Sequence, residues 1–238
     1  MWIDTMTVTA SIAGEIKMSV RVAVFGTSRS GKDYTIHDAM VILAEKGMMF
    51  SHISPINLIH EELNGKSLRD MPDAEKNTIV NVVRKRMEAP LQDEFVFTDE
   101  HYCFPRTFGG RRLNNGYYGE KLPYRIKKDI CGRKYEVVFN YNWFKRYDLA
   151  IYIEIDPHVI LDRFQSSVGV KYNPFATYDD IRSWQLFEIE NVQRMCHHFG
   201  VPMYYIYDPA HSGEEVATII SDYLDKCHIM NKKKKQRQ

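Results

Sequence analysis

The fold is decided by Val20-Arg21-Val22-Ala23-Val24-Phe25, followed at once by Gly26-Thr27-Ser28-Arg29-Ser30-Gly31-Lys32-Asp33. The first six residues are almost all apolar and predict a buried β-strand. The next eight match the pattern G-x-x-x-x-G-K, and a helix is predicted from about Gly31 to Lys46, closed by Gly47. A glycine-rich loop between a strand and a helix is the setting in which this pattern binds phosphate groups.

The chemistry of such a loop explains the expectation. Glycines let the backbone turn tightly so that successive N–H groups point inward, and the helix N-terminus adds partial positive charge. Lys32 is predicted to reach the β- and γ-phosphates of ATP and to neutralise charge during phosphoryl transfer. We therefore expect residues 26–33 to bind ATP. By contrast, Gly65-Lys66-Ser67 only imitates the end of the pattern, because position 60 is His60 rather than glycine.

Two carboxylates are candidate ligands for Mg²⁺. Asp33 stands where the pattern usually has Ser or Thr, and its carboxylate can bind the metal directly or through water. Asp99 ends the apolar run Phe95–Thr98, which predicts a strand whose carboxyl end lies at the ligand-binding edge of the sheet. Asp99 is predicted to hold Mg²⁺ or to orient the acceptor hydroxyl. The alternative is that it only caps the end of its strand.

Strands and helices alternate along the rest of the chain. Strands are predicted at residues 20–25, 48–53, 95–98, 149–155 and 203–207, and helices at 31–46, 56–64, 73–87, from Pro157, at 178–199 and at 214–227. Near-continuous apolar strands alternating with helices indicate a parallel sheet that is covered on both faces. We expect a three-layer α/β fold of the P-loop NTPase type, with five parallel strands, the loop strand central and a basic insertion.

In several places the chain resembles nucleotide kinases. Asp99-Glu100-His101-Tyr102 resembles the acid and aromatic pair of the thymidylate kinase family, which implies that His101 and Tyr102 contact the acceptor. The strand Tyr147–Ile155 with the following Leu161-Asp162-Arg163 resembles thymidylate and adenylate kinases, and the resemblance implies that Arg163 lies over the ATP base or phosphates. The alternative for Arg163 is a solvated arginine on the helix surface.

Residues 106–146 form a strongly basic segment that contains eleven Lys and Arg residues but only three acidic residues. It also holds nine aromatic residues, Phe108, Tyr117, Tyr118, Tyr124, Tyr135, Phe139, Tyr141, Trp143 and Phe144. Basic groups neutralise phosphates and aromatic faces stack on bases. Three interpretations stay open: a lid over ATP and a mononucleotide, a grip on a nucleic-acid strand, or a packed hairpin with charged outer faces. We expect some of Arg106, Arg111 and Arg112 to bind the acceptor and to stabilise transition-state charge.

Composition sets the remaining expectations. The domain is predicted to span residues 20–230, after an N-terminal extension at 1–19 and before a charged tail at 231–238 that is predicted to be disordered. No stretch approaches 18 uncharged apolar residues, so no membrane partner is expected. The first ten residues do not look like a secretion signal, and the four cysteines form no C-x-x-C pair. These features predict a cytoplasmic location.

The sequence thus predicts a kinase that uses ATP and Mg²⁺ to phosphorylate a nucleotide acceptor. The basic segment and the basic tail also suit an alternative acceptor. In this combination the chain resembles the 5-hydroxymethyluracil DNA kinases, a subgroup of the thymidylate kinase-like enzymes. This resemblance implies phosphorylation of a base hydroxymethyl group within DNA. Two other classes stay open, an NTP hydrolase or switch and a nucleic-acid-binding module.

Overall fold

The structure, a computed structural model, describes residues 9–10, 16–17, 20–66, 71–88, 95–108, 111–112, 125–137, 144–166 and 176–235. Its centre is a five-stranded sheet in the order β12-β11-β3-β5-β4. The strands are β3 (Val20–Phe25), β4 (Phe50–Ile53), β5 (Phe95–Glu100), β11 (Leu149–Ile153) and β12 (Met203–Ile206). All neighbouring pairs are parallel, so the predicted α/β fold with the loop strand in the middle is confirmed.

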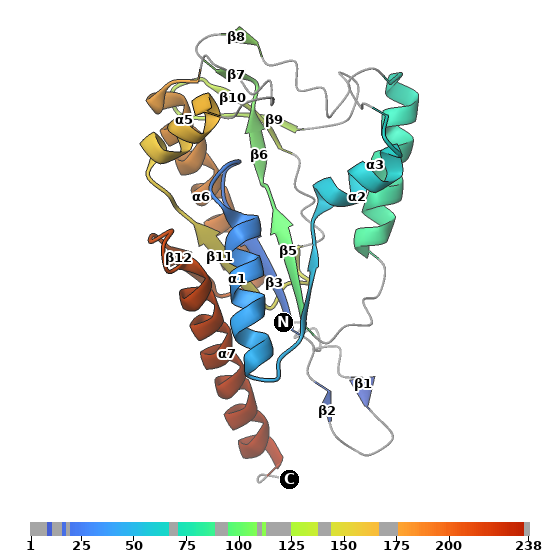
Figure 1. Ribbon diagram of the computed structural model, residues 1–238, viewed down its shortest axis with the longest axis vertical. Coiled ribbons are helices and arrows are strands. Elements are labelled where there is room, and N and C mark those ends of the chain that lie inside the picture. The colour runs from blue at the N-terminus through green and yellow to red at the C-terminus, as the bar shows by residue number, and fades with distance from the viewer. Residues whose placement is uncertain are drawn as a thin grey trace.

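Helices cover both faces of this sheet (Figure 1). In front lie α1 (Lys32–Glu45) and α7 (Ser212–Lys235), which pack against each other. Behind lies α6 (Tyr178–Phe199), with α5 (Pro157–Ser166) against it. The pair α2 (Pro55–Leu63) and α3 (Asp73–Glu88) stands beside the β4 edge. These helices agree with the predicted ones except at the end of α7.

The helices on both faces explain why the central strands β3 and β11 are apolar along almost their whole length. Every residue of β11 is buried, and in β3 only Arg21 is partly exposed. A strand that has helices on both faces has no solvent-facing side, so it carries no polar alternation. A separate small apolar cluster around Ile59, Leu63 and Val83 joins α2 to α3.

Two strands of the basic segment join β6, which lies just before the segment, in a second, smaller sheet. Its antiparallel strands lie in the order β6-β10-β9, with β6 at Cys103–Pro105, β10 at Lys134–Val137 and β9 at Arg125–Lys128. Tyr135 of β10 is buried and its ring stacks on Phe187 of α6 with 4.3 Å between centroids. In its described part the segment thus packs one face of a hairpin on α6, which leaves all three interpretations open, while residues 109–110, 113–124 and 138–143 lie outside the described ranges. A further short pair joins β7 (Thr107–Phe108) to β8 (Arg111–Arg112).

The two ends of the chain differ from expectation in one respect. Helix α7 continues to Lys235, so residues 231–235, predicted as part of a disordered tail, are helical. Lysine is a good helix former, and positive charge at a helix C-terminus interacts favourably with the helix dipole. Within the extension, β1 (Thr9–Ala10) and β2 (Ile16–Lys17) form an antiparallel pair. None of the described helices is long and apolar enough to cross a membrane.

Candidate active site

The loop after β3 adopts a tight, glycine-dependent shape. Gly26 has a φ of +153°, and a Cβ placed there would lie 2.9 Å from the Ile153 carbonyl oxygen and 2.8 Å from the Ser30 hydroxyl. Gly31, with φ +94°, is the residue from which α1 starts. Between them the Ser30 N–H donates to the Thr27 carbonyl at 3.1 Å, which closes the turn. The two glycines of the predicted pattern thus lie at the two places where the backbone needs them.

The loop leaves polar groups without protein partners. No side chain caps the N-terminus of α1, so no side-chain acceptor takes up its first-turn N–H groups. The hydroxyl oxygens of Thr27 and Ser30 are buried and have no hydrogen-bond partner. Buried polar groups are normally paired, and unpaired ones call for an explanation such as a ligand. Backbone donors, hydroxyls and the positive end of a helix together suit a phosphate group.

Lys32 is buried at 5 % exposure and lies at the centre of the site. Its ammonium donates to the Gly26 carbonyl at 2.8 Å and to the Thr27 carbonyl at 3.4 Å. The same nitrogen lies 3.5 Å from Asp99 Oδ1 and 3.2 Å from His101 Nε2. The loop and the carboxyl end of β5 therefore meet at this side chain.

The predicted metal ligands Asp33 and Asp99 come together across the loop. Burial and the neighbouring Asp99 carboxylate raise the pKa of Asp33. Burial is the largest single effect and disfavours the charge on Asp99, but the Lys32 ammonium together with His101 and His52 outweighs it, and the pKa of Asp99 is lowered. Two adjoining carboxylates repel each other unless a proton or a cation lies between them. The carboxylate pair therefore fits a Mg²⁺ ion, which prefers carboxylate and phosphate oxygens.

His101 is held as a neutral ring beside the lysine. Burial and the Lys32 ammonium lower the pKa of His101 to about 3, so its Nε2 accepts a hydrogen bond from Lys32 at neutral pH. Its other nitrogen, Nδ1, lies 3.9 Å from Oε1 of Glu188 on α6. Glu188 is fully buried, accepts the Tyr102 N–H at 2.7 Å, and burial raises its pKa to about 7.

Arg163 reaches the loop from α5. Its Nη1 donates to the Arg29 carbonyl at 2.8 Å, and a Cβ on Gly31 would lie 3.5 Å from the same nitrogen. Arg29 itself has a left-handed φ of +69°, which turns the loop at this point. The arginine is therefore a loop contact and not a solvated residue of the helix surface.

The predicted acceptor residues do not all lie together. His101 faces Lys32, whereas the Tyr102 hydroxyl donates to Asn191 Oδ1 at 3.2 Å and accepts from Lys127 at 2.8 Å. Tyr102 is thus buried against α6, because side chains alternate along an extended chain and its neighbour takes the site-facing position. Arg106 lies at the end of β6. Arg111 and Arg112 make up β8, and their role stays a prediction.

The structure adds residues that the sequence did not place in the site: His52 was not singled out, and Ser54 only weakly resembles a turn of adenylate kinases. His52 of β4 interacts electrostatically with both Asp33 and Asp99, and its Nε2 is buried without a partner. Ser54, the residue before α2, is buried and its hydroxyl is also unpartnered. His52 lies near the carboxyl end of β4 and Ser54 directly follows that strand, at the same end of the parallel sheet as Asp99, and that position was the available signal. Glu188 gave no signal, because a glutamate within a charged helix looks solvent-exposed.

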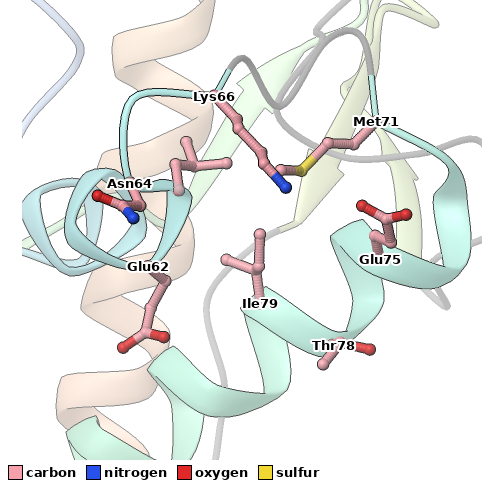
Figure 2. A pocket seen from close by; sticks show the side chains of 8 residues that line it. Glu62, Asn64, Lys66, Met71, Glu75, Thr78 and Ile79 are labelled. Carbon is pink, nitrogen blue, oxygen red and sulfur yellow. The ribbon is translucent and has the colours of Figure 1, made fainter.

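A separate hollow of about 310 Å³ lies between α2 and α3. Figure 2 shows Lys66 and Met71 on one side of it, with Ile79 and Glu75 on α3. None of the predicted site residues lines it. Lys66, the lysine of the imitating Gly65-Lys66-Ser67 sequence, belongs to this hollow and not to the phosphate loop.

Comparisons with known proteins yield likenesses of structure at low identity. No family model and no curated protein sequence matches the chain. A shikimate kinase from Acinetobacter baumannii in complex with shikimate has a TM-score of 0.47 at 11% identity, covering 88% of this chain and 95% of that one. A shikimate kinase from Bacteroides thetaiotaomicron has a TM-score of 0.42 at 13% identity, covering 87% and 98%. A protein from Thermus thermophilus has a TM-score of 0.46 at 10% identity, covering 87% and 99%.

Proposed function

We propose that the protein is an ATP-dependent kinase that transfers the γ-phosphoryl group of ATP to a hydroxyl group of a nucleotide acceptor. The observation that carries the proposal is the meeting of Lys32, Asp99 and His101 at a glycine-dependent loop in front of the uncapped helix α1. A buried lysine and two flanking carboxylates at such a loop match the requirements of phosphoryl transfer, in which catalysis is mostly positioning and charge stabilisation.

The proposal assigns the following roles to the residues of the site. Backbone N–H groups of residues 27–32 and the Lys32 ammonium bind the β- and γ-phosphates. The acceptor hydroxyl oxygen forms a bond to the γ-phosphorus as the bond between that phosphorus and the β–γ bridging oxygen breaks, which leaves ADP. Asp99, charged because its pKa is lowered, orients the hydroxyl and accepts its proton. Arg163 stabilises the charge that develops on the phosphoryl oxygens.

Mg²⁺ would be held by Asp33 and Asp99, with ATP completing its coordination. When bound, the ion neutralises the charge of the phosphate oxygens. His101 stays neutral and fixes the Lys32 ammonium between itself and Asp99. His52 of β4 and Ser54 directly after it are the proposed acceptor contacts, since each has a buried polar atom without a partner and His52 interacts electrostatically with Asp33 and Asp99.

The proposal is tested with γ-labelled ATP offered to a panel of free nucleotides and to DNA that contains hydroxymethylated bases. Lys32→Ala is expected to lower the rate of label transfer by a factor of about 10³ or more, because the cation on the transferred group is lost. Lys66→Ala is the matched control, since this exposed lysine ends an imitation of the same pattern and lies away from the loop.

Three results would go against the proposal. Full label transfer by the Lys32→Ala protein would show that the loop is not the site. Rapid release of phosphate without any acceptor, and no labelled nucleotide, would instead indicate an NTP hydrolase. Absence of Mg·ATP binding by the unaltered protein would rule out both the kinase and the NTP hydrolase.

A further inference from the structure

Strand register places three cations in one row across the small sheet. Lys134 of β10 lies directly opposite Lys128 of β9. On its other side, β10 pairs with β6, and the Arg106 N–H donates to the Lys134 carbonyl at 3.0 Å, one residue beyond the Tyr135–Pro105 pair. Residues that lie directly opposite each other in antiparallel strands project to the same face. Arg106, Lys134 and Lys128 therefore share one face of the sheet.

At β9 and β10 that face is turned away from α6. Tyr135, next to Lys134 in β10, is buried and stacks on Phe187 of α6. Successive side chains of a strand point to opposite faces, so Lys134 and Lys128 point away from the helix. At the β6 end the same face meets α6, where the Phe104 ring lies 5.9 Å from the ring of Trp184, centroid to centroid. Lys128 and Lys134 are exposed accordingly, and Arg106 is half-buried.

The row carries more positive charge than its surroundings balance. Within the described ranges neither Lys128 nor Lys134 pairs with an acid, while Glu136, two residues from Lys134 on the same face, interacts with Arg106. The nearby Asp129 carboxylate accepts the backbone N–H groups of Cys131 and Arg133. Like charges directly opposite each other destabilise a strand pair. An anionic ligand lying over the lysine pair would relieve this repulsion.

The cationic row adjoins the candidate active site. Strand β6 begins two residues after His101, and the His101 ring lies 4.8 Å from the ring of Phe104, centroid to centroid. Phe104 and Arg106 are two residues apart in an extended chain, so they lie on the same face. The face thus runs from His101 outward, and Figure 1 shows the small sheet beyond the carboxyl end of β5.

The tip of the β9–β10 hairpin presents an apolar side chain. Ile130 is fully exposed. The turn that holds it is well braced, because Asp129 accepts two backbone N–H groups and the Gly132 N–H donates to the Asp129 carbonyl at 3.1 Å. An exposed isoleucine on a braced basic hairpin suits contact with the face of an unstacked base.

We propose that this face binds the sugar-phosphate backbone of a single-stranded nucleic acid that carries the acceptor hydroxyl, with Ile130 against a base. Three residues across neighbouring strands span about 10 Å between the outer Cα atoms, so the row matches several phosphates better than the single phosphate group of a mononucleotide. The inference rests on the proposed function, because it names the class of acceptor for that site.

The test is fluorescence anisotropy with a fluorescein-labelled single-stranded oligodeoxynucleotide over a range of salt concentrations. The unaltered protein is expected to bind more weakly as salt rises. Lys128→Gln with Lys134→Gln should weaken binding at least fivefold at low salt and reduce the magnitude of the log–log salt slope by about 1.4, which corresponds to two phosphate contacts. Ile130→Ser should weaken binding without changing that slope.

The matched control is Lys85→Gln with Lys226→Gln, which removes the same charge from exposed positions on α3 and α7. Its binding should stay within twofold of the unaltered protein. Equal weakening by both double variants, or no oligonucleotide binding at all, would overturn the inference. Binding of Mg·ATP, measured by calorimetry on the same proteins, tests the proposed function separately, so failure of one can be told from failure of the other.

Discussion

At the scale of single residues, the glycines of the loop are not equivalent to glycines elsewhere. Gly26 and Gly47 both have positive φ angles, but only Gly26 has backbone within 3 Å of the place where a Cβ would be. Strain at Gly47 is purely conformational, since nothing lies within 4 Å of that position. The pair therefore separates the role of loop shape from the general effect of losing a glycine.

Gly26→Ala is expected to lower the free energy of unfolding by about 1–3 kcal/mol and to abolish most Mg·ATP affinity, because the added methyl group pushes the loop away from the Ile153 carbonyl. Gly47→Ala should lower the free energy of unfolding by about 1 kcal/mol and leave the Mg·ATP affinity unchanged. Urea unfolding and titration calorimetry measure the two quantities. Unchanged Mg·ATP affinity in the Gly26→Ala protein would contradict the assignment of the loop.

The carboxylate of Asp33 gives a second residue-scale prediction. If Asp33 and Asp99 share a Mg²⁺ ion, Asp33→Asn should raise the Mg²⁺ concentration needed for half-maximal phosphoryl transfer several-fold, because one charged ligand is replaced by a neutral one. Glu45→Gln removes the same charge from the exposed end of α1 and should leave the Mg²⁺ dependence unchanged. An identical Mg²⁺ curve for both variants would exclude Asp33 as a ligand.

At the scale of elements, α6 organises the back of the site. Its sheet-facing side buries Gln185, Glu188 and Asn191 together with apolar residues. Gln185 donates to the Ile155 carbonyl at 2.7 Å, and Asn191 binds Tyr102. The helix starts at a capping box in which Thr177 accepts the Asp180 N–H and the Asp180 carboxylate accepts the Thr177 N–H. The start of α6 therefore fixes the position of a buried polar stripe.

Thr177→Ala is expected to lower the free energy of unfolding by about 1 kcal/mol, because the first turn of α6 loses its side-chain acceptor. Thr218→Ala on α7 is the control, since its exposed hydroxyl only bonds back to the Glu214 carbonyl, and it should change stability by less than about 0.5 kcal/mol. Equilibrium urea unfolding distinguishes the two. If both substitutions lowered stability equally, the capping hydrogen bond of Thr177 would contribute no more than the exposed hydroxyl of Thr218.

At the scale of the whole molecule, buried acids make stability depend on pH. Burial raises the pKa of Glu100 to about 8, while the Tyr147 hydroxyl donates to its carboxyl group. Between its ordinary pKa of about 4.5 and this value, the folded state holds a proton that the unfolded state has released. Stability therefore falls as pH rises, by up to about 1.4 kcal/mol per pH unit. His101 acts in the opposite direction between about pH 3 and 6.5, because only the unfolded state protonates it there.

Glu100→Gln should remove most of the loss of stability between pH 7 and 8, a window in which His101 no longer titrates and Glu188, with a pKa of about 7, releases only the remainder of its proton. The measurement is urea unfolding at pH 7.0, 7.5 and 8.0. Glu75→Gln, an exposed substitution on α3, should keep the slope of the unaltered protein. If the free energy of unfolding of the Glu100→Gln protein still falls as steeply between pH 7 and 8, another group releases the proton.

The order of strands and helices, the phosphate loop with Lys32, and the carboxylate at the end of β5 could be read from the sequence. Each depends on a local pattern: an apolar run, two glycines at a fixed spacing, an acid directly after a strand. The pairing of Asp33 with Asp99, the neutral ring of His101 above Glu188, and the approach of His52 and Ser54 appear only in the tertiary structure. Strand order and register bring those side chains together, and these depend on how distant segments pack.

The same distinction explains the expectations that differed. Tyr102 looked like an acceptor contact because it follows Asp99, yet the alternation of side chains turns it toward Asn191. The end of α7 looked too charged to be ordered, yet the chain stays helical to Lys235. The cationic row of the small sheet joins residues more than twenty positions apart, and only the pairing of β6, β10 and β9 puts them on one face. Local sequence determined which elements form and where the phosphate loop lies, whereas packing decided which side chains share the site.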